Sequence, residues 1–137
     1  MNLGSLFIKK LNFLFLLILI SSGYCLASEK SLPERIDSMT LLLAETEDPV
    51  KHIDLLNEIS YQYRRIDPEK VLEYAKKAKT LSKLHNYRRG LAKAYNRLGI
   101  GYHRLNVDRD TSIHYYLKSI EIAKEVGEHY TLSLIHI

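Results

Sequence analysis

The amino-acid sequence predicts an all-α fold, an α-solenoid in which antiparallel helix pairs stack side by side. From Leu32 onward, apolar residues recur at helical spacing, without the alternation that is typical of strands. Two Asp-Pro pairs supply helix start signals, and a set of helical positions recurs after about 40 residues. The length of 137 residues limits the chain to one domain or part of one.

Residues 1–27 are predicted to be a secretory signal peptide. Lys9 and Lys10 supply its positive charge, and the apolar run Leu11–Ile20 follows them. This run is too short for a permanent anchor, because a membrane span needs about 20 apolar residues. Small residues before Ser28 favour cleavage after Ala27. We therefore expect an exported chain that is periplasmic or otherwise extracytoplasmic.

The lone cysteine, Cys25, lies inside this leader. A lipoprotein signal would attach a lipid to such a cysteine, but it usually needs a small residue just before it, and Tyr24 is bulky. A buried N-terminal helix is a second alternative, which the order of charged, apolar and small residues disfavours. A single cysteine excludes internal disulfides and cysteine-cluster zinc sites, and cleavage would leave a chain without cysteine.

A leading helix is predicted over Pro33–Thr46, and a second helix over about Val50–Ile66. Asp48-Pro49 precedes the second helix, where the aspartate can accept free backbone amide protons and the proline has none to offer. The leading helix places its apolar side chains on one face: Ile36, Met39, Leu42 and Leu43.

Three more helices complete the predicted array. Asp67-Pro68 repeats the start signal and predicts a helix over Pro68–His85. A fourth helix is predicted over Arg88–Leu105, and Asn106–Asp110 is then a polar turn. The fifth runs over Thr111–Val126 and ends at a glycine.

The second and fourth predicted helices match at a shift of 39 residues, and the third and fifth at a shift of 41. The difference of two residues falls in the turn between the paired helices, where a change of length costs little. Small residues at matched positions predict close helix contacts, and the tyrosines beside them are expected to pack. The matched pairs include Leu56 with Tyr95, Ile59 with Leu98, Ser60 with Gly99, Tyr63 with Tyr102, Tyr74 with Tyr115, Ala75 with Tyr116 and Ala78 with Ser119.

These residues resemble the tetratricopeptide repeat. Tyr95–Tyr102 followed by Ser112–Ile120 matches its pattern of aromatic, large and small positions, and Leu56–Tyr63 with Val71–Ala78 is a weaker copy. The resemblance implies a module that binds proteins or peptides. Together with the leader, it also resembles the sensory end of bacterial signalling proteins, whose output is a histidine kinase, a nucleotide cyclase or a transcriptional regulator. The alternative is a free-standing periplasmic scaffold or assembly factor.

The resemblance divides the chain into a leading helix, two repeats and the start of a third. Leu132–Ile137 also matches the translation of a transposon end that is used to fragment DNA for sequencing. We therefore expect these six residues to be adapter-derived and the solenoid to be truncated. The alternative is a native first turn of the next helix. The predicted segments are 32–47, 50–87, 88–127 and 128–137.

Stacking of the tetratricopeptide type would place the first helix of each pair on a concave groove. Amide and guanidinium groups along such a groove suit the backbone and carboxylates of an extended peptide. The alternative is a polar face that only contacts solvent. The candidate groove residues are Asp54, Asn57, Tyr61, Arg64, Arg65, Lys93, Asn96, Ile100, His103 and Arg104.

Composition and motifs point away from other functions. The net charge of +4 falls to +2 without the leader lysines, which is too weak to indicate a nucleic-acid partner. The six histidines show no metal-binding spacing, and no nucleophile motif or phosphate-binding glycine loop is present. We expect no metal, no cofactor and no catalysis by this chain. Membrane contact is expected only through the leader or a span further downstream.

Overall fold

The computed structural model describes residues 30–127. The chain divides into two units, one before Leu32 and one from Leu32 onward, and the second unit is described here by itself. The predicted signal peptide, residues 1–27, lies outside the described residues. The predicted third repeat and adapter-derived end, residues 128–137, also lie outside them.

The described residues are all-helical, as predicted, and contain no strand. Every predicted helix is present, with boundaries that match to within a few residues. The helices are α2 (Leu32–Glu45), α3 (Pro49–Tyr63), α4 (Pro68–Leu84), α5 (Arg88–Leu105) and α6 (Arg109–Glu125).

The two Asp-Pro pairs start helices as predicted. The Asp48 carboxylate accepts the backbone amide protons of Val50 and Lys51, at 2.9 and 3.0 Å. The Asp67 carboxylate does the same at the start of α4, where both bonds measure 3.0 Å. Each carboxylate satisfies amide groups that have no partner inside the helix.

Two predicted boundaries differ from the observed ones by more than one residue. The second helix ends at Tyr63 rather than Ile66, because a tight turn follows in which the Tyr63 carbonyl accepts two further amide protons. The fifth helix begins at Arg109 rather than Thr111. Asp108, which was assigned to the polar turn, is its N-cap and accepts the amide proton of Asp110 at 3.0 Å.

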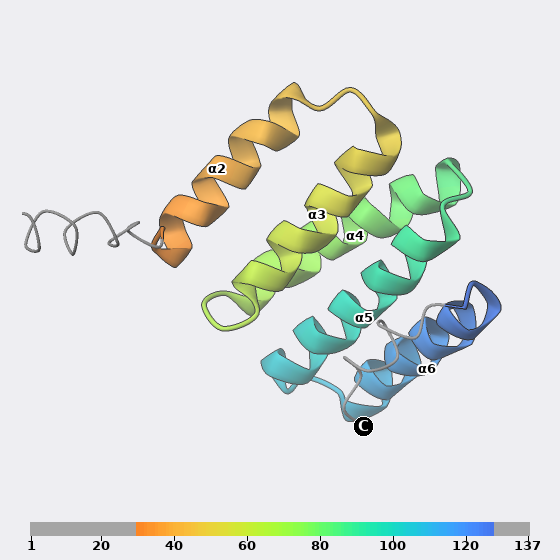
Figure 1. Cartoon of the computed structure of the whole chain (residues 1–137). Helices are drawn as coiled ribbons and strands as arrows, with labels where there is room; N and C mark the ends of the chain where they lie inside the picture. The colour runs from red at the N-terminus through yellow and green to blue at the C-terminus, as the bar shows by residue number, and fades with distance from the viewer. Residues whose placement is uncertain (1–29, 128–137) are drawn as a thin grey trace, which may run out of the picture. The chain divides into compact units, whose positions relative to one another are not determined.

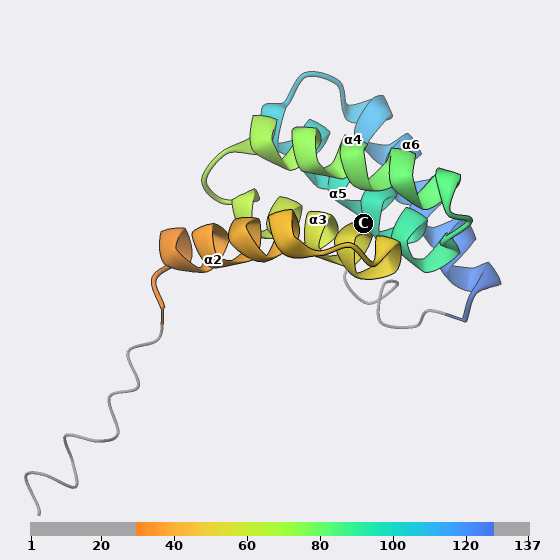
Figure 2. The same ribbon diagram turned by 90° about the horizontal axis from the view of Figure 1, so that it is seen from above.

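The helices pack in sequence order, and α5 also packs against α3 (Figure 1). Figure 2 shows α4 on one side of α3 and α2 beside α3. The main hydrophobic cluster joins α4, α5 and α6, and a smaller one joins α3, α4 and α5. The buried members of the main cluster are Leu72, Ala75, Leu91, Ala92, Tyr95, Leu98, Ile122 and Ala123.

Small residues mark the close contacts between helices. The Ser60 hydroxyl of α3 donates to the backbone carbonyl of Val71 on α4 at 2.9 Å, although both residues are fully buried. In α5, a methyl group at Gly99 would lie only 2.6 Å from the Tyr116 ring, and one at Gly101 only 2.4 Å from Leu72. Glycine therefore lets α5 approach α6 at one position and α4 at the other.

Each helix pair contains an equivalent contact between two tyrosine rings. Tyr63 stacks on Tyr74 with ring centroids 5.8 Å apart and an interplanar angle of 13°. Tyr102 stacks on Tyr115 with values of 5.4 Å and 8°. These are the tyrosines that the sequence shift relates, so α3 packs on α4 at this contact as α5 packs on α6.

Candidate functional site

The predicted groove residues lie on α3, on α5 and in the turn that follows α3, but their surroundings differ. Asn57 and Asn96 are buried, Asp54, Tyr61, Arg64, Lys93 and Ile100 are partly buried, and Arg65, His103 and Arg104 are exposed.

The two asparagines are buried rather than exposed on an open surface. Each is 1% exposed. The Asn57 amide donates to the backbone carbonyl of Gly90 at 3.1 Å, which ties α3 to the first turn of α5. The Asn96 carbonyl oxygen accepts from the Arg97 guanidinium at 2.7 Å. Their burial does not agree with the expectation that these amides contact a bound peptide.

An ion pair joins α3 to α5 at the next predicted position. The Lys93 ammonium lies 3.0 Å from a carboxylate oxygen of Asp54, and the Tyr87 hydroxyl donates to the other oxygen at 3.1 Å. A hollow of about 540 Å³ lies beside this pair, between α2, α3 and α5. A charged ligand here would compete with an internal ion pair.

Two guanidinium groups lie over the ring of Tyr61. Arg64 is 3.7 Å from the centroid of its ring, and Arg97 is 4.3 Å from it. Such contacts are favourable because the ring face carries negative charge density. Arg97 is buried and was not predicted. The sequence did indicate that this position differs between the repeats, because the matched residue of the first repeat, Glu58, has the opposite charge.

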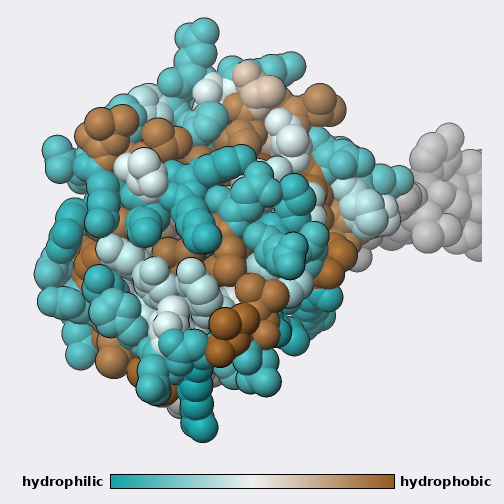
Figure 3. Space-filling view, turned by 180° about the vertical axis from the view of Figure 1, so that it is seen from behind, coloured by the Kyte–Doolittle hydropathy of each residue, from teal (hydrophilic) through white to brown (hydrophobic). Residues whose placement is uncertain are grey.

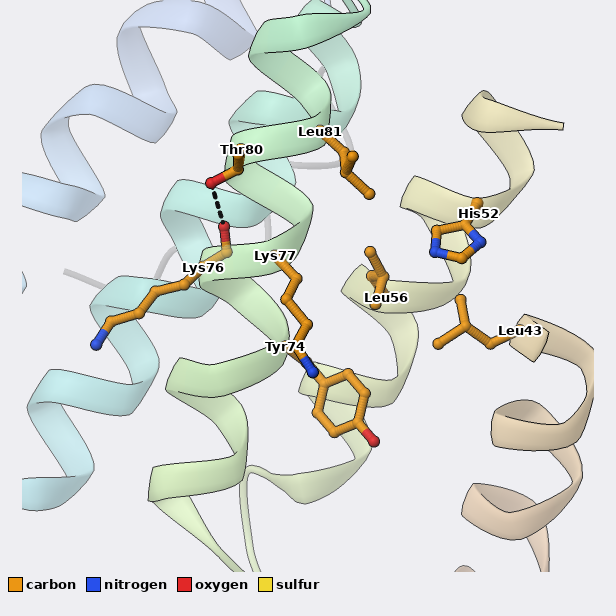
Figure 4. Close-up of a pocket in the computed structure, with 8 residues that line it drawn as sticks. All are labelled: Leu43, His52, Leu56, Tyr74, Lys76, Lys77, Thr80 and Leu81. Carbon is orange, nitrogen blue, oxygen red and sulfur yellow. Dashed lines mark hydrogen bonds between the residues drawn. The ribbon is translucent and has the colours of Figure 1, made fainter. Parts of the chain in front are cut away.

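A cleft that the sequence did not predict lies where α2, α3 and α4 meet. Its volume is about 600 Å³. Leu43, Leu56 and Leu81 point toward one another from the three helices, and Lys77 extends toward the Tyr74 ring (Figure 4). The remaining lining residues are His52, Lys76 and Thr80.

The surface around α4 is mixed in character. Seen from the side of α4, hydrophilic residues cover most of the face, and hydrophobic residues gather in patches between them (Figure 3). Lys76 and Lys77 are exposed on this helix. The cleft therefore combines an apolar interior with a polar and cationic rim.

Two lysines lower the pKa of Glu73, a carboxylic acid of α4 near the cleft. The Lys77 ammonium bonds one oxygen of Glu73 at 2.8 Å, and Lys70 bonds the other at 2.9 Å. These hydrogen bonds, that of Lys77 first, lower the pKa of Glu73 to about 2. Glu73 therefore stays ionised at neutral pH, and it holds Lys77 near the Tyr74 ring, with the ammonium 5.3 Å from the ring centroid.

The matching place in the second helix pair is filled by an aromatic ring. Tyr95 stands where the first pair has Leu56, and its ring stacks on Tyr115 with centroids 5.9 Å apart. The Lys118 ammonium lies 5.6 Å from the Tyr95 ring centroid. Tyr95 is buried, so this part of the second pair belongs to the core.

Residues 30–127 contain neither a cluster of metal-ligating side chains nor a helix that could span a membrane. This part of the chain has no group of three or more His, Cys, Asp or Glu side chains that could hold a metal ion. None of its helices is long and apolar enough to cross a membrane.

Comparisons with protein-family models, with curated proteins and with solved structures find no match to this chain. The resemblance to the tetratricopeptide repeat therefore rests on the residue pattern quoted above.

Proposed function

We propose that this chain is an exported helical-repeat module, similar to the tetratricopeptide repeat, that binds a protein or peptide partner. The observation that carries the proposal is the repeated tyrosine stack, Tyr63 on Tyr74 and Tyr102 on Tyr115. Helix pairs that pack alike present neighbouring, similar surfaces, and repeat proteins bind their partners along such surfaces.

The surfaces of the described residues support binding. Arg65, His103 and Arg104 are exposed on the side of the predicted groove, and the cleft beside α4 is apolar within and cationic at its rim. Such surfaces suit a peptide that carries both carboxylates and apolar side chains. As the sensory end of a signalling protein, the module would pass the effect of binding to a downstream output domain.

Export and binding are tested separately. The full chain is fused to alkaline phosphatase, which becomes active only after export, and we expect activity that is lost when Lys9 and Lys10 are both replaced by Glu. Activity that survives this change, or never develops, would contradict the predicted leader.

Binding is tested by selecting short random peptides on the purified full chain. We expect peptides that bind saturably with one site per chain and that lose binding when the chain is unfolded by urea. A selection that yields no such peptide would refute the proposed binding function.

A further inference from the structure

We infer that the cleft between α2, α3 and α4 is a docking site for an aromatic side chain of an acidic peptide from a partner protein. The inference rests on the proposed binding function and specifies the surface and the chemistry. Three observations carry it: the comparison of the two helix pairs, the position of the lysines and the charge of the lining.

In the second helix pair, a tyrosine ring occupies the position that corresponds to the cleft. Its rings form a continuous stack in which Tyr115 lies between Tyr102 and Tyr95. In the described part of the first pair, the stack contains Tyr63 and Tyr74, and Leu56 stands at the position of Tyr95. An aromatic ring from outside would occupy, over Tyr74, the place that Tyr95 occupies over Tyr115.

The lysines at matched positions support this arrangement. Lys118 lies over the outermost ring of the second pair, which is Tyr95, and Lys77 lies over Tyr74, which is outermost in the first. An entering ring that stacks on Tyr74 would displace the Lys77 ammonium outward, because only 5.3 Å now separates this ammonium from the Tyr74 ring centroid. The entering ring would gain a stacking contact on one face and a cation–π contact on the other.

The size and lining of the cleft suit an apolar anchor with acidic flanks. Its volume of about 600 Å³ is typical of ligand sites. Leu43, Leu56 and Leu81 form an apolar interior that would contact the ring. The described residues that line the cleft include Lys76 and Lys77 but no carboxylate. Lys77 is bonded to Glu73 beside the cleft at 2.8 Å, so an Asp or Glu next to the peptide's aromatic residue would compete with Glu73 for Lys77 and would also be complementary in charge to Lys76.

The decisive variant is Leu56→Tyr, which places the second pair's own ring in the cleft. We expect peptides selected on the parent chain to bind this variant at least about tenfold more weakly, while its helix content is unchanged. The matched control is Leu55→Tyr, because Leu55 is the neighbouring residue but lines the separate hollow beside Asp54. Binding to the control should equal binding to the parent.

A second pair of variants tests the charge without touching the core. In Lys76→Glu with Lys77→Glu, the rim of the cleft becomes acidic, and we expect binding to fall about tenfold. Lys83→Glu changes an exposed lysine of the same helix outside the cleft and should leave binding unchanged. Replacing the aromatic residue of a selected peptide by Ala should abolish its binding to the parent chain.

The outcomes separate this inference from the proposed function. Selected peptides that bind Leu56→Tyr as tightly as the parent, or that lack an aromatic or acidic residue, would overturn the cleft as the site and leave a binding module with its surface elsewhere. If Leu56→Tyr fails to fold, undiminished binding to the Lys76→Glu, Lys77→Glu variant overturns the inference. A selection without any binder contradicts the proposed function itself.

Discussion

The two helix pairs, α3 with α4 and α5 with α6, share a tyrosine stack but distribute side-chain volume differently around it. Ser60 and Ala75 stand in the first pair where Gly99 and Tyr116 stand in the second. In the second pair, the glycine provides the space that the Tyr116 ring occupies. Each pair thus reaches close packing with its own combination of small and large residues.

The same comparison explains why the cleft lies beside the first pair. Tyr95 fills the space next to Tyr115 from within the chain, whereas Leu56 is too small to do the same next to Tyr74. Leucine at this position is still buried, so the pair is packed but the space outside it remains open. The smaller side chain of Leu56, together with the position of α2, therefore leaves a cleft beside the first pair.

The largest expected effect comes from forcing volume into the second pair. Gly99→Val should lower the free energy of unfolding by about 3 kcal/mol, because the added carbons would meet the Tyr116 ring. Urea denaturation measures the loss. Combining Gly99→Val with Tyr116→Ala should cost less than the sum of the two single changes. Simple additivity would show that the glycine and the ring do not share this space.

Converting the second pair to the pattern of the first should have the next largest effect. Tyr95→Leu should cost about 2 kcal/mol, because the buried ring and its stacking on Tyr115 are lost. Thermal or urea unfolding measures the change. Tyr95→Phe is the control, since it keeps the ring and should stay close to the parent in stability. Equal losses in both variants would assign the effect to the hydroxyl group instead.

Removing the N-cap aspartate of α4 or of α6 should lower the free energy of unfolding by smaller, unequal amounts. Asp67→Ala should cost about 1 kcal/mol, because two backbone amides at the start of α4 lose their acceptor. Asp108→Ala should cost less, since one backbone amide and the Thr111 hydroxyl are bonded there. Urea midpoints of the two variants give the order. A greater loss at Asp108 would contradict it.

The smallest expected effect is on the pH dependence of the free energy of unfolding, to which Glu73 of the first pair contributes. The folded-state pKa of Glu73 is lowered to about 2 from an ordinary value of 4.5, so its contribution is present above pH 4.5 and is lost as the pH falls toward about 2. The contribution is below about 1 kcal/mol, because the carboxylate is 42% exposed and screened by solvent.

Glu73→Gln should remove this part of the pH dependence and change little else. Urea midpoints of parent and variant, compared between about pH 6 and about pH 3, measure it. The matched position of the second pair is His114, so α6 has no carboxylate at this position. An unchanged acid response in the variant would show that other carboxylates dominate.

The sequence predicted the helices well because local rules determine them. Asp48 and Asp67 each precede a proline, and the apolar spacing between such signals leaves little choice of structure. The errors fell at Tyr63 and Asp108, where a turn and a cap compete over a few residues. Such competition depends on backbone conformation, which includes a left-handed Asn106 with φ of 51°.

The binding surface was less predictable, because it depends on contacts between helices. A polar residue on a helix face does not reveal whether it meets solvent or the backbone of a neighbour. Asn57 meets the carbonyl of Gly90, where the missing side chain permits a close approach. The cleft depends on how α2 lies beside α3 and on the small size of Leu56, and neither follows from periodicity.

The stacked tyrosines also give the helical region an intrinsic spectroscopic signal. The chain has no tryptophan, and its phenylalanines, at positions 7, 13 and 15, all lie in the predicted leader. Ultraviolet absorption and emission of the helical region thus arise from tyrosine, and rings held in parallel at about 5 to 6 Å couple electronically. Near-ultraviolet circular dichroism can follow the assembly of each helix pair without any introduced label. Replacing Tyr74 by Leu removes the stack of the first pair, so the signal reports on the second pair, and replacing Tyr115 by Leu does the reverse.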